Sequence, residues 1–419
     1  MYLKDEIKRL AKEYLGEVRR YRRFLHANPE LSFNEDQTAE YVADQLLALG
    51  LEPIEGIAET GLMAIIEGKN PKSKTIALRA DMDALPIQEE NNVPYKSRNP
   101  GVMHACGHDV HTAILLGTAK VLQEIKNSFE GTIKLIFQPG EEVTPSGAPV
   151  MIKEGVLDSP SMGKKVKSIF ALHVDPTSNV GKVGFKEGPM LASCDDIFIT
   201  VKGVGGHAAF PEDFTDTVLI ASQLVVSLQQ IVSRNAPPSV PSVLSFGRII
   251  AEGSNNIIPD TAIIEGTFRT FDETWRADAI QRITNLAKAI AQGMGGDCEI
   301  SITPGCPSLH NASKLTKRSI KRSEAFLGEG NVEIIPNLIM GSEDFAFYSH
   351  VVDACFWTLG VRNEAKNIVS NIHTPTFDID EDALEVGVGL TTWLALSELG
   401  INEKSIVEPP VKKYGSVKI

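Results

Sequence analysis

Residues 103–142, MHACGHDVHTAILLGTAKVLQEIKNSFEGTIKLIFQPGEE, contain the pattern that decides the fold. From about 109 to 126 the apolar residues recur at helical spacing, whereas the run 132–138 is short, apolar and bounded by Gly and Pro. The pattern predicts a helix followed by a buried strand. Similar apolar runs at 61–67 and 75–79 come earlier in the chain. This alternation of strands and helices predicts an α/β domain with a mixed, largely parallel sheet flanked by helices.

The N-terminal region predicts two helices. Leu3, Ile7, Leu10 and their successors follow the spacing of one helix face. A second helix is expected from about 35 to 49, with Asn34 as its N-cap. The first 15 residues are charged from position 4 and contain no apolar core segment or small-residue cleavage site, so we do not expect a secretory signal.

From about residue 195 the order of predicted elements changes to β-α-β-β-α-β, which is the ferredoxin-like unit. The expected strands and helices are 197–202, 217–233, 243–250, 262–269, 273–292 and 298–303. We therefore predict an α+β domain over 191–305, inserted into a larger α/β domain formed by 1–190 and 306–419. The tail from about Glu403 is expected to be partly disordered.

Composition excludes several classes of protein. The 419 residues include 41 Lys and Arg against 54 Asp and Glu, a formal charge of −13. No basic excess is available to neutralise phosphates, which argues against a nucleic-acid partner. The sequence contains no run of about 18 apolar residues, so we do not expect a membrane span. The five scattered cysteines do not form a disulfide framework, so a reducing cytoplasm is the expected location.

The densest cluster of reactive side chains lies within 103–112. It includes Cys106 and His108, separated by one glycine that permits a sharp bend. A thiolate and an imidazole are good ligands for zinc and similar ions. The cluster therefore indicates a metal site; the alternative is that the histidines cap or line a helix and Cys106 is an inert buried thiol.

Two adjacent carboxylates, Glu141 and Glu142, follow the predicted strand 132–138. Successive side chains diverge, so we expect one glutamate to bind metal and the other to transfer a proton from water to a leaving nitrogen. A solvated loop is the alternative explanation.

Further histidines and carboxylates also follow predicted strands. His173 comes directly after an apolar run, and His373 precedes the acidic stretch FDIDED. Both histidines become stronger candidates for the site if the sheet brings its strand ends together at one edge. Asp81 and Asp83 also follow a strand; carboxylates there can orient metal-bound histidines, bind metal themselves, or lie in a solvated loop.

In the inserted domain, the glycines before His207 do not match a phosphate-binding loop or a dinucleotide fingerprint. We expect them to let the backbone turn and present His207. Asn256 offers an amide. Arg269 offers a guanidinium able to grip a substrate carboxylate, although a surface ion pair is the alternative.

These residues together resemble the dinuclear-metal amidohydrolases and peptidases of the aminoacylase and carboxypeptidase G kind. The branch that resembles the chain most includes hippurate hydrolase, N-acyl-amino-acid amidohydrolases and auxin–amino-acid conjugate hydrolases. The resemblance runs from about Arg20 to Leu394. It rests on FLHANPELSFNE (24–35), RADMDALPIQE (79–89), MHACGHDVHTA (103–113), FQPGEE (137–142), GGHAAFPE (205–212), NIIPD (256–260), GTFRTF (266–271), GSEDFAFY (341–348) and IHTPTFDIDE (372–381).

The resemblance implies a role for each candidate residue. Two divalent ions per subunit, of zinc, manganese, cobalt or nickel, would be held by Cys106, His108, Glu142, His173 and His373, with Cys106 as the bridge. Glu141 would be the general base. His207 of the inserted lid or dimerisation domain would reach the neighbouring subunit's active site, and Asn256 and Arg269 would bind the substrate carboxylate.

The expected reaction is metal-dependent hydrolysis of an N-acyl-amino acid by a cytoplasmic homodimer or homotetramer. Cleavage of unblocked peptides by a dipeptidase or carboxypeptidase is the alternative, and Asp175, where relatives carry an apolar or aromatic residue, puts the substrate class in doubt. A cysteine nucleophile at Cys106 is a rival mechanism that would survive chelation. A non-catalytic binding protein is disfavoured because every proposed ligand and both glutamates are present.

Overall fold

The computed structural model describes residues 1–407, which divide into two compact units. The first unit comprises 1–188, 311–336 and the chain from 347, and the second comprises 189–310 and 337–346. The sequence-based division placed all of 306–419 in one domain, whereas 337–346 group with the second unit. Those ten residues have neither helical nor strand periodicity, so their pattern does not indicate that the chain goes back to the second unit there.

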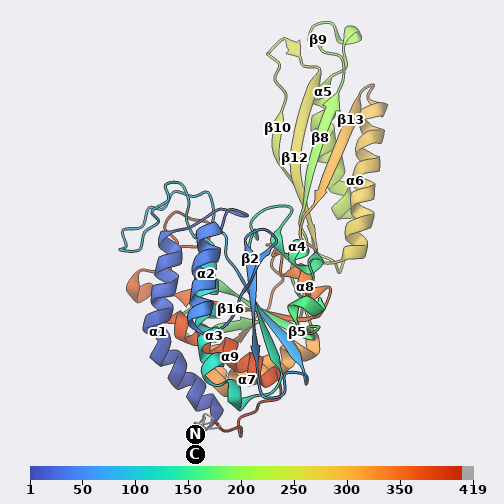
Figure 1. The fold of residues 1–419 in the computed structure, drawn as a ribbon. Coiled ribbons are helices and arrows are strands. Elements are labelled where there is room, and N and C mark those ends of the chain that lie inside the picture. The colour runs from blue at the N-terminus through green and yellow to red at the C-terminus, as the bar shows by residue number, and fades with distance from the viewer. Residues whose placement is uncertain (408–419) are drawn as a thin grey trace, which may run out of the picture. The chain divides into compact units, whose positions relative to one another are not determined.

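The first unit is built on an eight-stranded sheet in the order β1-β2-β4-β3-β5-β16-β6-β15 (Figure 1). Its strands are β1 (Ile54–Ile57), β2 (Gly61–Glu67), β3 (Thr75–Asp81), β4 (Thr132–Gln138), β5 (Ser168–Asn179), β6 (Val183–Phe185), β15 (Val332–Ile334) and β16 (Asp353–Arg362). The pairs β3–β4, β3–β5, β5–β16 and β6–β15 are parallel, and the remaining three are antiparallel. The predicted mixed, largely parallel sheet is therefore confirmed.

Helices pack on this sheet and on one another (Figure 1). They are α1 (Leu3–Ala27), α2 (Asp36–Ala48), α3 (His108–Glu124), α4 (Gly147–Lys153), α7 (Ser313–Leu327) and α9 (Ala383–Glu398), with the single turn α8 (Ala346–Ser349) at a unit boundary. The prediction that Asn34 caps α2 is wrong. The Asn34 amide donates to the Ser32 carbonyl, and the Glu30 carboxylate instead accepts the N–H groups of Gln37 and Thr38.

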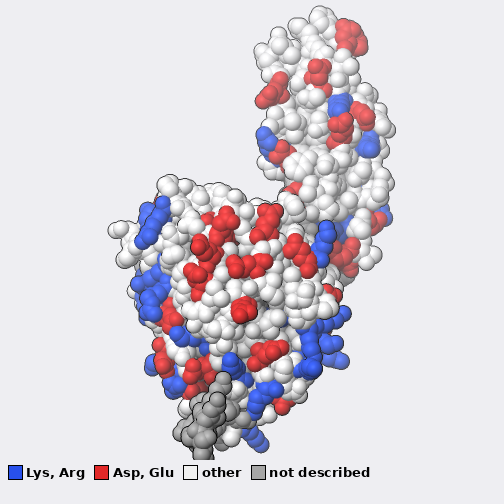
Figure 2. Space-filling model, viewed as in Figure 1, with Lys and Arg blue, Asp and Glu red and all other residues white. Residues whose placement is uncertain are grey.

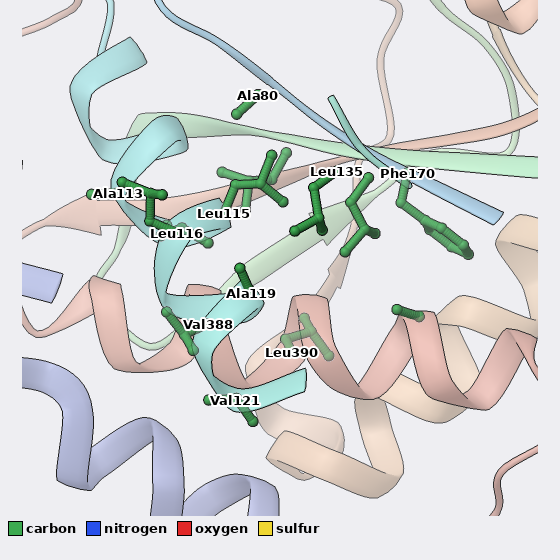
Figure 3. Packing of buried hydrophobic residues seen from close by; sticks show 14 of the residues in the cluster. Ala80, Ala113, Leu115, Leu116, Ala119, Val121, Leu135, Phe170, Val388 and Leu390 are labelled. Carbon is green, nitrogen blue, oxygen red and sulfur yellow. The ribbon is translucent and has the colours of Figure 1, made fainter. Parts of the chain in front are cut away.

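Helix α3 is the centre of the core. Almost every one of its residues is buried, because the helix lies between the sheet, α1 and α9. Figure 3 shows side chains of α3, the sheet and α9 meeting in one apolar cluster. Gly117 makes the close approach possible: a Cβ there would lie 2.6 Å from Val18 and 2.7 Å from Val388. The core thus fixes the N-terminus of α3, where His108 begins the helix.

The second unit is a four-stranded antiparallel sheet in the order β10-β12-β8-β13. Its main elements are β8 (Asp195–Lys202), α5 (Thr217–Gln230), β10 (Ser242–Ile250), β12 (Thr261–Thr270), α6 (Glu273–Gly293) and β13 (Asp297–Pro304). The short pairs are β9 (Gly206–His207) with β11 (Ile257–Ile258), and β7 (Gly188–Leu191) with β14 (Leu309–Asn311). The predicted ferredoxin-like order is confirmed, with one face of the sheet covered by α5 and α6 over a separate core.

The two ends of the described chain meet. The N–H of Leu3 donates to the carbonyl of Ser405 at 2.8 Å, and Tyr2 forms an isolated β-bridge with Ile406. Residues 403–407 of the tail that we predicted to be partly disordered are therefore ordered, and the rest of that tail lies outside the described residues.

Within the described residues, no helix is both long and apolar enough to cross a membrane. Figure 2 shows Asp and Glu side chains gathered on the viewed face of the first unit, with Lys and Arg nearer its margins. A face of this charge would repel the phosphates of a nucleic acid.

Candidate metal centre

The candidate site lies at the carboxyl ends of the central parallel strands of the first unit. Strand β3 ends at Asp81, β4 ends just before the turn that carries Glu141, and β5 carries His173. The segment with His373 joins them, because its N–H donates to the carbonyl of Ala105 at 2.7 Å. Parallel strands bring their carboxyl ends to one edge of a sheet, which is where sites in such folds are found.

Five predicted ligands converge on this edge. The Cys106 Sγ atom lies 3.4 Å from His173 Nε2 and 3.3 Å from His373 Nε2. The Glu142 Oε1 atom lies 3.4 Å from His373 Nε2 and 3.9 Å from His108 Nε2. The structure thus brings together side chains separated by up to 267 residues in the sequence.

The donor atoms form two overlapping groups, each suited to one metal ion. Cys106, His108 and His173 make one group, and Cys106, Glu142 and His373 make the other, with all donors of a group within 4.8 Å of one another. The Nε2 atom of His108 and the Oε1 atom of Glu142 are buried and have no hydrogen-bond partner among the described residues. A cation in each donor group would satisfy one of these two atoms, so the residues present fit a pair of divalent ions.

The second nitrogen of His108, which is buried, and of His173, which is half-buried, is already engaged. His108 uses Nδ1 to contact Asp83 Oδ1 at 3.1 Å, and His173 Nδ1 contacts the carbonyl of Val174 at 2.8 Å. Such bonds fix the tautomer and turn Nε2 toward a metal. The Oδ2 atom of Asp83 also accepts the backbone N–H of Glu142 at 2.9 Å, so Asp83 orients two candidate ligands at once.

Asp81 lies beside the candidate ligands, with its Oδ2 atom 3.9 Å from His108 Nε2. Its carboxylate contacts His111 Nδ1 at 2.6 Å and accepts a hydrogen bond from Arg79 at 2.5 Å. The other His111 nitrogen accepts the N–H of Val174. Both nitrogens of His111 are thus used in holding the strand ends together. Burial lowers the pKa of His111 to about 4, consistent with a neutral ring.

Burial among carboxylates governs the protonation of the site. It raises the pKa of the Cys106 thiol well above its ordinary value, although the nearby His108 acts in the opposite direction. A thiol with a raised pKa is a poor nucleophile, which weighs against the cysteine-nucleophile mechanism. Burial also raises the pKa of Asp83, but the hydrogen bond and charge of His108, with hydrogen bonds from the Glu142 N–H and Ser32, together outweigh burial and hold that pKa below its usual range.

Glu141 and Glu142 lie on a tight turn whose geometry depends on Gly140. Gly140 has a φ of +62°, and a Cβ at this position would come within 2.6 Å of the Phe33 ring. Both glutamate side chains approach His108. The turn thus directs Glu142 toward the candidate ligands and leaves Glu141, which is half-buried, at the same edge.

The candidate residues of the second unit fall into two places. His207 is exposed on β9 and lies beside Asn256, because the N–H of Ala208 donates to the carbonyl of Asn256 at 3.0 Å. Arg269 stands at the far end of β12, eight residues from Thr261, or about 26 Å along a strand. Its guanidinium is half-buried and donates to the carbonyl of Met340 at 2.9 Å. Within one copy of the chain, Arg269 and Asn256 are not brought together.

The Asp175 carboxylate is hydrogen-bonded to Thr177. Its Oδ1 atom accepts hydrogen bonds from both the backbone N–H and the hydroxyl of Thr177. The Asp175 carboxylate is therefore occupied within β5 itself by the backbone and side chain of Thr177.

The sequence analysis did not single out a buried polar network beneath the site. The ring of His26 lies between Asp109 at 2.8 Å and Glu89 at 3.2 Å, and Arg22 donates to Asp109 at 2.8 Å. His104, fully buried nearby, has no hydrogen-bond partner among residues 1–407 on either nitrogen. Burial lowers the pKa of His104 to about 4. The advance signal was that His26, Glu89, His104 and Asp109 lie in the motifs at 24–35, 79–89 and 103–113.

Comparison with known proteins agrees with this geometry. Residues 77–396 match the model of peptidase family M20/M25/M40. An N-acyl-L-amino acid amidohydrolase of Geobacillus stearothermophilus is 43% identical over 302 residues, which cover 72% of this chain and 80% of that protein. Thermostable carboxypeptidase 2 of Saccharolobus solfataricus is 35% identical over 399 residues, 94% of this chain and 99% of that protein.

A solved structure is also similar. It is a protein of Bacillus subtilis described as a dinuclear metal binding peptidase of the M20 family. The TM-score is 0.78 at 34% identity, and the match covers 94% of this chain and 100% of that one.

Proposed function

Because the chain belongs to peptidase family M20/M25/M40 and is a hydrolase of that family, we propose that it hydrolyses the amide bond of N-acyl-amino acids. The observation that carries the proposal is the pair of donor groups that share Cys106. Zinc, manganese, cobalt and nickel all accept a set of one thiolate, three imidazoles and one carboxylate. Amidohydrolase relatives at 38–43% identity favour an acylated amino acid as substrate.

The metal ions would be held by Cys106, His108, Glu142, His173 and His373. Bound there, two divalent ions would lower the pKa of water toward neutrality and polarise the scissile carbonyl.

The acid–base work falls to Glu141. Its carboxylate would accept a proton from the attacking water and then deliver that proton to the leaving nitrogen. Substitution Glu141→Gln keeps the size of the side chain and removes the base. We expect that variant to retain its metal and to lose turnover, and near wild-type activity would remove Glu141 from this role.

We further propose that His207 stabilises the negative charge that develops on the carbonyl oxygen, and that Asn256 and Arg269 bind the substrate carboxylate. A donor of this kind is worth about 3–4 kcal/mol of transition-state stabilisation. The separation of Asn256 and Arg269 within one copy supports a site assembled from two copies, and hence an obligate homodimer or homotetramer. We propose the cytoplasm as its location on the separate ground that the five scattered cysteines form no disulfide framework.

Peptide cleavage is the second candidate, favoured by the similarity to thermostable carboxypeptidase 2. The two activities differ in whether the acyl side of the substrate must carry a free α-amino group. Both would need the same metal site, so only substrate comparison separates them.

The deciding experiment is a substrate panel on chelator-stripped protein. N-acetyl-, N-benzoyl- and indoleacetyl-amino acids and unblocked dipeptides would each be tested with zinc, manganese, cobalt, nickel or no metal restored. Metal-dependent release of amino acid from the acylated substrates supports the proposal. Cleavage of dipeptides alone moves the protein to the peptidase function, and activity indifferent to metal contradicts both.

A further inference from the structure

Glu35 is a fully buried carboxylate that holds the turn on which Glu141 stands. Its Oε1 atom accepts the backbone N–H of Gly140 at 2.9 Å, and its Oε2 atom accepts the hydroxyl of Thr60 at 2.6 Å. Gly140 directly precedes Glu141 in the chain. One carboxylate, from the loop before α2, thus ties the start of β2 to the turn after β4.

The backbone N–H groups of the two residues that flank Glu141 are therefore bound by buried carboxylates. Glu35 accepts the N–H of Gly140, and Asp83 accepts the N–H of Glu142. Asp83 has an evident second task in orienting His108, whereas the two hydrogen bonds of Glu35 lead only to this turn and to Thr60. The two carboxylates thus hold the backbone before and after Glu141.

Several residues near Glu35 and Thr60 have positive φ angles. Phe33, two residues before Glu35, has a φ of +60°, and Ala58 and Glu59, directly before Thr60, have φ values of +50° and +72°. Ala58 and Glu59 lie in the short hairpin loop between β1 and β2, where positive φ values are the ordinary turn geometry. Phe33 lies outside a hairpin, so its left-handed backbone is imposed by the surrounding structure.

The space around the turn is filled from three sides. A Cβ at Gly61 would lie 2.7 Å from the Pro139 ring, and one at Gly147 would lie 1.9 Å from the Pro139 carbonyl oxygen. The ring of Phe33 covers Gly140. Packing confines the turn, and two directional hydrogen bonds set its peptides. The Gly140 carbonyl, in the peptide before Glu141, accepts the N–H of Gly147 at 2.9 Å, and the Glu35 carboxylate fixes the preceding Pro139–Gly140 peptide through the N–H of Gly140.

A buried carboxylate is a costly way to make these two hydrogen bonds. Burial and the neighbouring Asp83 carboxylate both raise the pKa of Glu35. An ionisable group kept at a fully buried position beside this turn is more easily explained by function than by stability.

We propose that Glu35, together with Thr60, is a positioning residue that fixes the peptide of Gly140 and so aims the carboxylate of Glu141 at the reacting water. This inference rests on the proposed function, because it takes Glu141 as the base. Glu35 itself does not touch substrate or metal. Its loss should therefore lower kcat, with little change in KM or in metal content.

The test compares kcat, KM and bound metal in metal-loaded Glu35→Ala and Glu35→Gln. Alanine removes both acceptors, and we expect kcat to fall about 10–100-fold, the scale expected for a small misplacement of a catalytic group. Glutamine keeps an acceptor for Gly140, and its amide N–H₂ can donate to the Thr60 oxygen. We expect Glu35→Gln to restore kcat to within about threefold of wild type.

Glu30→Ala is the matched control. The Glu30 carboxylate also accepts two N–H groups in the same segment, but those belong to Gln37 and Thr38 at the start of α2. We expect it to lower thermal stability and leave kcat unchanged. An equal fall of kcat in Glu30→Ala, or loss of metal in Glu35→Ala, would show a general structural effect and overturn the inference.

Two further variants keep the test decisive. If Glu35→Ala does not fold, Thr60→Val removes one of the two bonds at nearly constant volume; a lower kcat with unchanged KM supports the inference, and an unchanged kcat overturns it. Glu141→Gln is measured alongside. An active Glu141→Gln would defeat the proposed role of the base, whereas an inactive Glu141→Gln with a fully active, folded Glu35→Ala would defeat this inference alone.

Discussion

The burial of Glu35 predicts an unusual dependence of stability on pH. Its side chain has no solvent exposure, and burial, with repulsion from Asp83, raises the pKa of Glu35 from an ordinary 4.5 to about 7. The folded chain therefore holds this proton more tightly than the unfolded chain does. Below pH 4.5 both states are protonated and the full benefit is present; it is lost progressively as the pH rises to about 7.

The size of the effect follows from the two pKa values. At about 1.4 kcal/mol for each pH unit between them, Glu35 should lose about 3 kcal/mol of stabilisation between pH 4.5 and pH 7.5. Glu35→Gln cannot ionise. The free energy of unfolding of the wild type, taken relative to that variant, should fall by this amount over the same range, while other titrating groups cancel in the difference.

The assay is urea unfolding of both proteins with chelator present, at several pH values from 4.5 to 7.5. Trp357 and Trp393 are buried in the first unit and Trp275 in the second, so a Trp275→Phe background makes fluorescence report on the first unit alone. The reasoning would be refuted if the difference in unfolding free energy between the two proteins did not change with pH, or if the wild type became more stable relative to the variant as the pH rises. Either result would mean that Gly140 and Thr60 keep Glu35 ionised.

Three other perturbations have defined outcomes. Cys106→Ser should reduce bound metal below two ions per chain, measured by elemental analysis, because the shared sulfur is lost; full occupancy would contradict a bridging role. Asp83→Asn should weaken metal affinity about 10–100-fold in a chelator competition, and unchanged affinity would show that it orients no ligand. Gly117→Leu should destabilise the chain by about 1–3 kcal/mol or more in thermal unfolding, since even a Cβ meets Val18 and Val388; a wild-type melting temperature would show that this contact yields freely.

The fold could be predicted because local pattern and tertiary context agree. The apolar run at 132–138 is strand β4 with the same bounds, and the helical spacing after residue 108 is α3. The ferredoxin-like order was readable because each of its elements is long and periodic. The segment 337–346 was assigned to the wrong unit because it has neither helical nor strand periodicity, and only tertiary contacts determine where it packs.

The site could be predicted in part because reactive residues followed strand ends. Cys106, His108 and Glu142 lie in dense motifs, whereas support for His373 came from the expected gathering of strand ends at one sheet edge and from the resemblance, since its position beside Cys106 depends on the fold. Glu35 was taken only as the start of a helix. Nothing in its local sequence shows that its carboxylate turns inward to meet Gly140, a contact 105 residues away.

Because residues 1–3 contact residues 405–407, the two ends of the described chain lie next to each other in the first unit. In the linear chain that unit is interrupted by the insertion of 189–310. If the existing ends were joined and a new opening were placed in the exposed turn at 237–239, residues 347 onward would run directly into residues 1–188. Such a circular permutant would turn an interrupted unit into a mostly contiguous one and divide the inserted unit between the new ends.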